Sequence, residues 1–180
     1  MNMIEEERNL FLIFQIDANR INARAQLPYM NQLEHWADSG IILVEMSQVA
    51  YDEARSGQDQ YRSHKVSGYI YSYTYADTLE EQQMIVEIAQ TLFPGGVRTP
   101  NDRRDVEIVF NARKYGATLV TADGAILDKS RELAARFRIS VMTDEQAVAF
   151  LHSRIRARDE RARQHAEDSS TQVPEWVGKD

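Results

Sequence analysis

The sequence predicts an α/β protein with a central, mainly parallel sheet between two layers of helices. One observation is a nearly unbroken apolar run over residues 10–16, as expected of a central parallel strand that is buried on both faces. Another is the helical spacing of apolar residues over 105–116, with Gly116 as a C-terminal stop and a short apolar strand over 117–123 directly after it. We therefore expect a three-layer α/β/α fold.

The first third of the chain predicts two strands with a helical region between them. Residues 20–38 have the pattern of a helix or a helix pair, broken near Pro28. Residues 41–44 form the second expected strand, and Ser47 follows as a good N-cap. The helix that Ser47 opens carries Glu53.

Tyrosines then occupy every second position from residue 69 to residue 75. This strict alternation favours a strand with one aromatic face, although a helix is the alternative at this point of an α/β protein. Such a row of rings either packs, within the protein or in a dimer, or stacks on nucleic-acid bases.

The second half of the chain continues the alternation. Thr78 begins a capping box that opens a helix ending near Phe93. Further helices are expected over 105–116 and 129–137, and residues 139–142 form the last expected strand. Thr143 begins another capping box and opens the final helix.

Four acids fall where such a fold brings side chains together: Asp17, Glu53, Asp105 and Asp123. Asp17 and Asp123 end strands, and ligands of open α/β sheets bind in the crevice outside the carboxyl ends of the strands. Carboxylates gathered there raise one another's pKa unless a cation lies among them. Hard divalent ions such as Mg²⁺ or Mn²⁺ prefer these oxygen ligands.

Each acid taken singly also has a structural explanation. Asp123 with Gly124 forms a turn, Asp105 gains from the dipole of its own helix, and Glu53 is a surface acid beside Asp52. The ordered set of four favours the metal-dependent site.

Three segments of the chain resemble the PIN-domain ribonucleases, a family that includes many prokaryotic toxin nucleases. They are Ile16-Asp-Ala-Asn19, Ser47-Gln-Val-Ala-Tyr-Asp-Glu53 and residues 105–123, the last with its Gly-Ala turn and Leu-Val-Thr-Ala-Asp strand end. The resemblance covers roughly residues 9–151. It implies a PIN-like fold and metal-activated hydrolysis of single-stranded or structured RNA.

Carried over residue by residue, the resemblance assigns both the metal-binding and the supporting positions. The metal-binding and catalytic acids are Asp17, Glu53, Asp105 and Asp123, with Mg²⁺ or Mn²⁺ as the cofactor. The supporting polar positions are Asn19, Ser47 and Thr121, and Asp102 is either a helix N-cap or a fifth acid. The family also suggests an antitoxin-type protein partner and a homodimer.

Composition sets outer limits on the function. The 180 residues contain no cysteine, which excludes disulfides, thiol catalysis and Cys-ligated zinc. The N-terminus is acidic where a signal peptide would be basic, and the apolar run over 10–16 is far shorter than the ~20 residues that span a bilayer. We therefore expect a cytoplasmic protein without a membrane partner.

The net charge of −7 gives no general affinity for nucleic acid, so any RNA contact must come from local basic clusters. Arg98, Arg103 and Arg104 lie next to the acid at 105 and are the candidate substrate contacts. We expect a nuclease domain over 9–152, followed over 153–180 by an arginine-bearing helical extension whose end, from residue 166, is disordered.

The most strongly indicated function is thus a divalent-metal-dependent endoribonuclease. Two alternatives remain open: a catalytically silent PIN-like module that binds RNA or protein, and a related structure-specific DNA nuclease. The chain has no Gly-x-Ser-x-Gly nucleophile elbow, no Walker A loop and no His-Glu-x-x-His motif.

Overall fold

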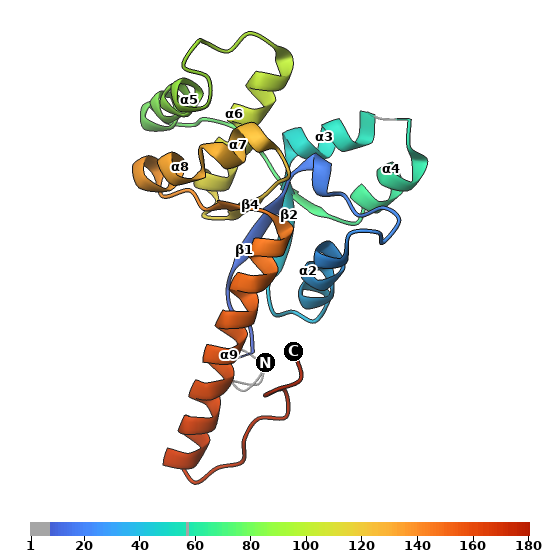
Figure 1. The fold of residues 1–180 in the computed structure, drawn as a ribbon, viewed down its shortest axis with the longest axis vertical. Helices are drawn as coiled ribbons and strands as arrows, with labels where there is room; N and C mark the ends of the chain where they lie inside the picture. Colours follow the sequence, from blue (N-terminus) through green and yellow to red (C-terminus); the bar gives the residue numbers. More distant parts are fainter. Residues whose placement is uncertain (1–7, 57) are drawn as a thin grey trace.

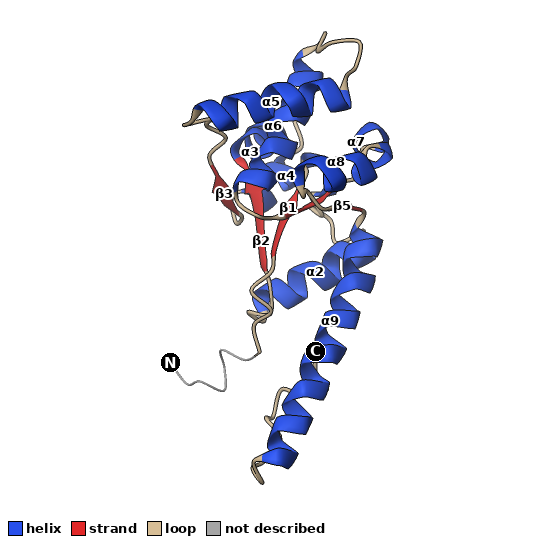
Figure 2. Cartoon of the chain, turned by 90° about the vertical axis from the view of Figure 1, so that its left-hand side faces the viewer, coloured by secondary structure: helices blue, strands red, loops and turns tan. Residues whose placement is uncertain are grey.

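A computed structural model describes residues 8–56 and 58–180 of the chain. Within them a single parallel sheet has the strand order β3-β2-β1-β4-β5 (Figure 2). Its strands are β1 (Ile13–Ile16), β2 (Leu43–Ser47), β3 (Ile70–Ser72), β4 (Thr118–Val120) and β5 (Val141–Met142). Because β1 lies at the centre, the residue that follows it reaches the middle of the sheet's carboxyl edge.

Helices cover both faces of this sheet (Figure 1). They are the short 3-10 helix η1 (Ala18–Arg20), α2 (Pro28–Asp38), α3 (Gln48–Ser56), α4 (Gln60–Val66), α5 (Leu79–Leu92), α6 (Pro100–Lys114), α7 (Gly124–Asp128), α8 (Ser130–Phe137) and α9 (Asp144–Asp168). α2 packs with α9, and α5 packs with α6 on the other side. The predicted three-layer α/β/α architecture is confirmed. None of the helices in the described ranges is long and apolar enough to cross a membrane.

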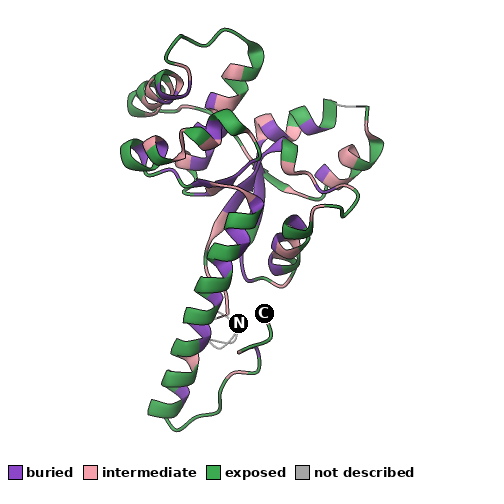
Figure 3. Ribbon diagram, viewed as in Figure 1, coloured by how far each residue is buried: buried purple, intermediate pink, exposed green. Residues whose placement is uncertain are grey.

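The core lies between the sheet and its two helical layers (Figure 3). Phe14 and Ile16 of β1 are fully buried, as the apolar run predicts for a central strand. Trp36 of α2 and Phe110 of α6 are fully buried as well. Since these four side chains come from β1 and from opposite layers, the position of β1 is set by packing from both sides.

The second strand lies later in the chain than the expected 41–44. Ile41 and Ile42 are buried but precede β2, which continues through Glu45 to Ser47. Glu45 is buried and accepts a hydrogen bond from the Ser72 hydroxyl at 3.2 Å. A buried carboxylate inside a strand interrupts the apolar pattern, and for that reason the sequence pattern ended the strand too early.

The helix that carries Asp105 begins at Pro100, five residues before the predicted start. Thr99 is its N-cap, and the Thr99 hydroxyl accepts a hydrogen bond from the Asp102 backbone N–H at 3.1 Å. The Asp102 carboxylate in turn accepts from the Thr99 backbone N–H at 3.2 Å. Asp102 is therefore the N3 residue of α6, which completes the capping box, and not the N-cap. Asp105 consequently lies in the second turn of α6.

The tyrosine row forms a strand over its first part only, because β3 ends at Ser72. The rings of Tyr71, Tyr73 and Tyr75 contact one another in sequence, and Tyr51 of α3 stacks on Tyr71 with centroids 4.4 Å apart. Tyr71, Tyr73 and Tyr75 are exposed. The rings of Tyr71, Tyr73 and Tyr75 thus form a surface feature of the edge strand β3 and of the segment that follows it.

The end of the chain differs from the expected disordered tail. α9 extends to Asp168, after which the chain turns back along this helix (Figure 1). Trp176 is buried, with the Arg158 guanidinium 4.5 Å from its ring centroid. The Arg158 side chain also donates to Asp180 at 2.8 Å and to the Arg8 carbonyl at 2.7 Å. A buried arginine of α9 therefore links both ends of the described chain.

Candidate active site

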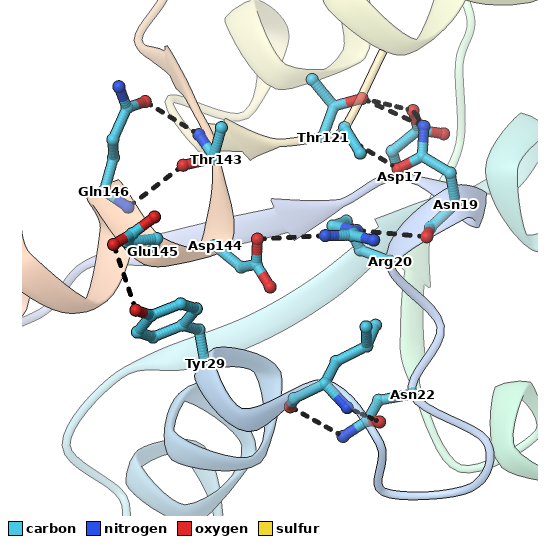
Figure 4. A network of polar contacts seen from close by, with 12 residues as sticks. Asp17, Asn19, Arg20, Asn22, Tyr29, Thr121, Thr143, Asp144, Glu145 and Gln146 are labelled. Carbon is cyan, nitrogen blue, oxygen red and sulfur yellow. Dashed lines mark hydrogen bonds and ion pairs between the residues drawn. The ribbon is translucent and has the colours of Figure 1, made fainter.

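The candidate site lies at the carboxyl ends of the neighbouring strands β1 and β4 (Figure 4). Asp17 follows β1 directly, and its backbone N–H donates to the Val120 carbonyl at 2.9 Å, which extends the pairing of the two strands by one residue. The Asp17 side chain is buried. The strand pairing therefore positions a carboxylate at the centre of the sheet's carboxyl edge.

The Thr121 hydroxyl connects the two acids that follow these strands. It donates to Asp17 Oδ2 at 2.7 Å and accepts from the Asp123 backbone N–H at 2.9 Å. Thr121 is fully buried. Since a hydroxyl has one proton and two lone pairs, this arrangement uses its donor for the carboxylate and orients the start of the loop after β4.

Asn19 completes the same network. Its side-chain amide donates to Asp17 Oδ2 at 2.7 Å and to the Thr121 hydroxyl at 3.2 Å, and its carbonyl accepts from the Ala122 backbone N–H at 3.0 Å (Figure 4). The structure thus brings the predicted supporting residues Asn19 and Thr121 into contact with Asp17. Both donors bond to the same oxygen of Asp17, which fixes the plane of the carboxylate.

Asp123 begins the helix α7. Its Oδ1 accepts from the Ile126 backbone N–H at 3.0 Å, so Asp123 is the N-cap of this helix as well as the acid after β4. The predicted turn at Asp123 and Gly124 is in fact the first step of a helix. Capping holds the carboxylate at one end of α7.

Asp105 experiences the charges of the other three predicted acids. Burial raises the pKa of Asp105 to about 7, and the charges of Asp123, Asp17, Glu53 and Asp102 add to that effect in decreasing order. Asp105 comes from α6 and Glu53 from α3, whereas the other two of the four predicted acids follow strands. Elements far apart in the sequence therefore concentrate negative charge around Asp105.

The pKa of Asp17 is also raised. Burial is the largest cause, and the charge of Asp123 acts in the same direction, whereas the hydrogen bonds from Thr121, the Ala18 backbone and Asn19 oppose it. The donors stabilise the ionised form, but they do not fully offset the loss of solvent. A cation near this carboxylate would therefore be favoured.

Ser47, the last residue of β2, directly precedes α3, and Glu53 lies within that helix. The Ser47 hydroxyl is fully buried and accepts from the Ala50 backbone N–H at 3.2 Å, as expected of an N-cap. Glu53 is exposed, one and a half turns later. The cap orients α3 so that Glu53 adds its charge to the environment of Asp105.

The donor set suits a hard divalent ion, because its acids supply only carboxylate oxygens. Within residues 8–56 and 58–180, however, no three acidic or histidine side chains are arranged to hold one ion directly. The crowding that raises the pKa of Asp105 is the observation that fits a cation here, since a positive charge would relieve it.

The predicted substrate arginines lie at the start of α6. Arg98, Arg103 and Arg104 line an open cavity of about 460 Å³ together with Glu107. Arg98 donates to the Gly95 carbonyl and Arg104 to the Asn101 side chain, and neither guanidinium has a carboxylate partner among residues 8–56 and 58–180. The structure places the three arginines on one cavity, and their contact with a substrate stays a prediction.

Two basic residues close to Asp17 were missed by the sequence pattern. Arg20 follows Asp17 by three positions, which was the available signal. Arg62 lies 45 positions later, and its guanidinium donates to the Ala18 carbonyl. Only the tertiary structure places the Arg62 side chain beside the first strand.

The chain was compared with known proteins by sequence and by structure. No protein-family model matches it, and neither does any curated protein. VapBC2 from Rickettsia felis, bound to a DNA fragment from its promoter, is similar in structure with a TM-score of 0.51 and 15% identity over 73% of this chain and 98% of that one. VapBC-1 from nontypeable Haemophilus influenzae gives 0.49 and 15% over 74% and 99%, and FitAcB from Neisseria gonorrhoeae gives 0.46 and 16% over 74% and 98%.

At such low identity the R. felis structure shows the fold and not the activity. It agrees with the parallel sheet and with its helical layers. The fold expected from the three resembling segments is therefore confirmed, and this chain has a PIN-domain fold.

Proposed function

We propose that this protein is a divalent-metal-dependent endoribonuclease. The observation that carries the proposal is Asp105 itself, because burial, together with the charges of the acids around it, raises its pKa to about 7. Structural networks also perturb carboxylates, but such a shift in a group held by several elements is typical of functional sites. The PIN-domain fold makes nuclease chemistry the natural use of these acids.

In this proposal Asp17, Asp105 and Asp123 hold one or two Mg²⁺ or Mn²⁺ ions, and Glu53 completes the site directly or through water. When bound, the metal supplies positive charge at the phosphodiester and lowers the pKa of the attacking water. The protein's own contribution is to fix the carboxylates. Thr121 and Asn19 hold the plane of Asp17, and such supporting hydrogen bonds typically change metal affinity or activity by ~10–100-fold.

Ser47 and Asp102 support the site through helix geometry in this proposal. Ser47 caps α3, which carries Glu53, and Asp102 belongs to the capping box of α6, which carries Asp105. Both therefore act as positioning residues. Arg98, Arg103 and Arg104 then contact phosphates of the RNA on the α6 side.

The proposal is tested by incubating the protein with a mixed pool of single-stranded RNA and DNA in Mn²⁺, Mg²⁺ or EDTA. We expect internal cleavage of RNA with either metal and none in EDTA. Cleavage of DNA alone would favour the structure-specific DNA nuclease instead. Binding without cleavage in either metal would favour the catalytically silent module.

A matched pair of variants connects the activity with the proposed acids. Asp123→Asn should abolish cleavage while its amide oxygen still caps α7. Asp128→Asn, an exposed acid at the other end of the same short helix, should cleave like the unmodified protein. Equal activity of both variants would contradict the assignment of Asp123.

The protein partner is a separate part of the proposal. The similar structure from R. felis is a VapBC2 complex, which suggests an antitoxin-type partner for this chain as well. The exposed rings of Tyr71, Tyr73 and Tyr75, on β3 and just after it, offer an aromatic surface of the kind enriched at protein interfaces. Light scattering on the purified chain measures whether it forms the expected homodimer in the absence of a partner.

A further inference from the structure

A second basic hollow lies beside the candidate site, between the loop after η1 and the helix α4. It has a volume of about 290 Å³, and Ala18 and Asn19 form part of its wall. Asn19 also donates to the Asp17 carboxylate, so the hollow and the acid site share this residue. With a water volume of ~30 Å³ for comparison, the hollow has room for a phosphate and its ribose.

The side chains that line this hollow carry a net positive charge. Arg20, Arg24 and Arg62 contribute three guanidinium groups to its lining, and Asp59 contributes the one carboxylate. Asp59 is already occupied as the N-cap of α4, where it accepts from two backbone N–H groups, and as the partner of Arg24 at 2.9 Å. Hydrogen bonding to those backbone groups lowers the pKa of Asp59, which keeps it ionised in these roles.

Arg62 is the arginine of this hollow that has a buried N–H group without a hydrogen-bond partner. Its Nη2 donates to the Ala18 carbonyl at 2.5 Å, while its Nε is buried without a hydrogen-bond partner. Within the described ranges it forms no ion pair. A buried guanidinium N–H that lacks a partner is costly, and a planar guanidinium can donate two parallel hydrogen bonds to a phosphate. The unsatisfied donor therefore points to an anionic ligand.

The loop that bears Arg20 and Arg24 is held in shape by internal hydrogen bonds. The buried Asn22 accepts from the Leu27 backbone N–H at 3.0 Å and donates to the Asn31 side chain at 2.5 Å. Arg20 forms an ion pair with Asp144 at 3.0 Å (Figure 4). The hollow is thus preformed, which lowers the entropic cost of binding a ligand.

We propose that this hollow binds a phosphodiester group of single-stranded RNA adjacent to the bond at the acid site. Arg62 is the principal donor, and Arg24 and Arg20 add positive charge at the rim. In Figure 1, α4 and the connection between α5 and α6 lie on different sides of the upper end of β1. An RNA strand held at Arg62 and at the Arg98 cluster would therefore pass across the acids. This inference rests on the proposed ribonuclease function and adds the path of the RNA across the site.

The test measures binding of a fluorescently labelled single-stranded RNA in EDTA by anisotropy, and its cleavage in Mn²⁺, for several arginine variants. Arg62→Gln should bind roughly 10-fold more weakly, because a charge-assisted contact to a phosphate is lost. In a plot of the logarithm of the binding constant against the logarithm of the salt concentration, the slope should become less steep by ~0.7, the value expected for one phosphate contact on a single strand. Arg24→Gln, on the exposed rim, should show a smaller loss of the same kind.

Two controls make the result decisive. Arg161→Gln removes an exposed arginine from the far part of α9 and should bind RNA normally. Arg62→Lys retains the charge but not the planar fork, and it should recover only part of the affinity. Thermal unfolding of each variant separates a loss of contact from a loss of fold.

The possible failures are distinguishable. Normal binding and a normal salt slope in both Arg62→Gln and Arg24→Gln, with the unmodified protein still cleaving RNA, would overturn the hollow and leave the ribonuclease proposal intact. An unmodified protein that neither binds nor cleaves RNA would overturn both. An equal loss in Arg161→Gln would show a general charge effect and would also reject the hollow.

Discussion

At the residue scale, the candidate site depends on how each carboxylate is held. Asp17 has two side-chain donors and lies in a buried position, whereas Glu53 is exposed on the surface of α3. Asp105 is affected by the charge of all the others. The acids therefore differ in how firmly they are held: the carboxylate at the sheet is fixed by hydrogen bonds, and those on the helices are less constrained.

The raised pKa of Asp105 predicts how the metal-free protein responds to pH. A carboxyl whose pKa is higher in the folded state than in the unfolded state stabilises the fold below its unfolded pKa, and this contribution is lost as the pH rises through the folded value of about 7. Above about pH 7 the ionised Asp105 carboxylate therefore destabilises the folded state, and Asp105→Asn removes that destabilisation. In EDTA we expect its melting temperature to exceed that of the unmodified protein by more at pH 8 than at pH 4.

The same substitution should remove most hydrolysis in Mn²⁺ while the fold persists, because the amide keeps the shape and loses the charge. Cleavage assays and melting curves on one sample measure both effects. Full turnover by Asp105→Asn, or a stability gain that does not depend on pH, would show that Asp105 has been assigned the wrong role.

Thr121 provides a test of the support for Asp17. Mn²⁺ should raise the melting temperature of the unmodified protein, since a ligand that binds only the folded state stabilises it. Thr121→Val keeps the shape of the side chain but removes the donor to Asp17 and the acceptor for Asp123 N–H. We expect ~10–100-fold weaker Mn²⁺ binding, measured from the concentration dependence of the melting temperature. Thr118→Val on the same strand is the control.

The rise in melting temperature that Mn²⁺ causes should also depend on the acids themselves. We expect a smaller rise in Asp17→Asn and almost none when Asp123→Asn is added. A full shift in that double variant would mean that Mn²⁺ binds elsewhere on the protein.

At the element scale, α6 contributes to both the acid site and the Arg98 cluster. Its capping box orders the first turn, and the second turn carries Asp105. The same cap also places Arg103 and Arg104 on the side of the cavity that they line. The geometry of this helix start is therefore coupled to the proposed function.

Thr99→Ala tests that coupling. Loss of an N-cap side chain costs about 1 kcal/mol of stability. Thr78, which caps α5 by accepting from the Glu81 N–H, offers the matched control, because Thr78→Ala should cost a similar amount far from the acids. Denaturant unfolding measures the two losses, and we expect only Thr99→Ala to reduce RNA cleavage. Equal cleavage by the two variants would separate the capping box from function.

At the scale of the whole molecule, the returning C-terminal segment links α9 to the beginning of the described chain. Arg158 is 4% exposed, which is low for an arginine, and it is bonded to Asp159, Asp180 and the Arg8 carbonyl. Burial raises the pKa of Asp180, but hydrogen bonds from Arg8 and Arg158, together with their charges, hold it below its usual value. This network gives the proposed 153–180 extension a structural role distinct from the acid site.

Trp176→Ala should expose Arg158 and destabilise the outer part of α9. Truncation of a buried tryptophan costs about 3 kcal/mol at the lower end of the usual range, which is the appropriate end for a residue packed on a single helix. Hydrogen exchange should show the loss in residues 155–168, while RNA cleavage stays close to normal. A loss of cleavage with unchanged exchange would instead place the C-terminal segment in the function.

The sequence by itself determined the fold class and the main acids. The apolar run before Asp17 and the strand before Asp123 were sufficient, because a buried parallel strand needs continuous apolar residues and the chain must leave the sheet at a polar residue. Asn19 and Thr121 were found by resemblance, and the structure brings both to Asp17. Local patterns of this kind extend over only a few residues and can be read directly.

Tertiary structure alone decided the features that depend on contacts between distant residues. The strand limits of β2 were shifted by Glu45, whose burial is compensated by Ser72, 27 positions away. The hollow at Arg62 and the return of Trp176 onto α9 likewise depend on side chains from separate elements. Polar groups can be buried wherever a partner is supplied, and the sequence pattern does not say which distant residue supplies it.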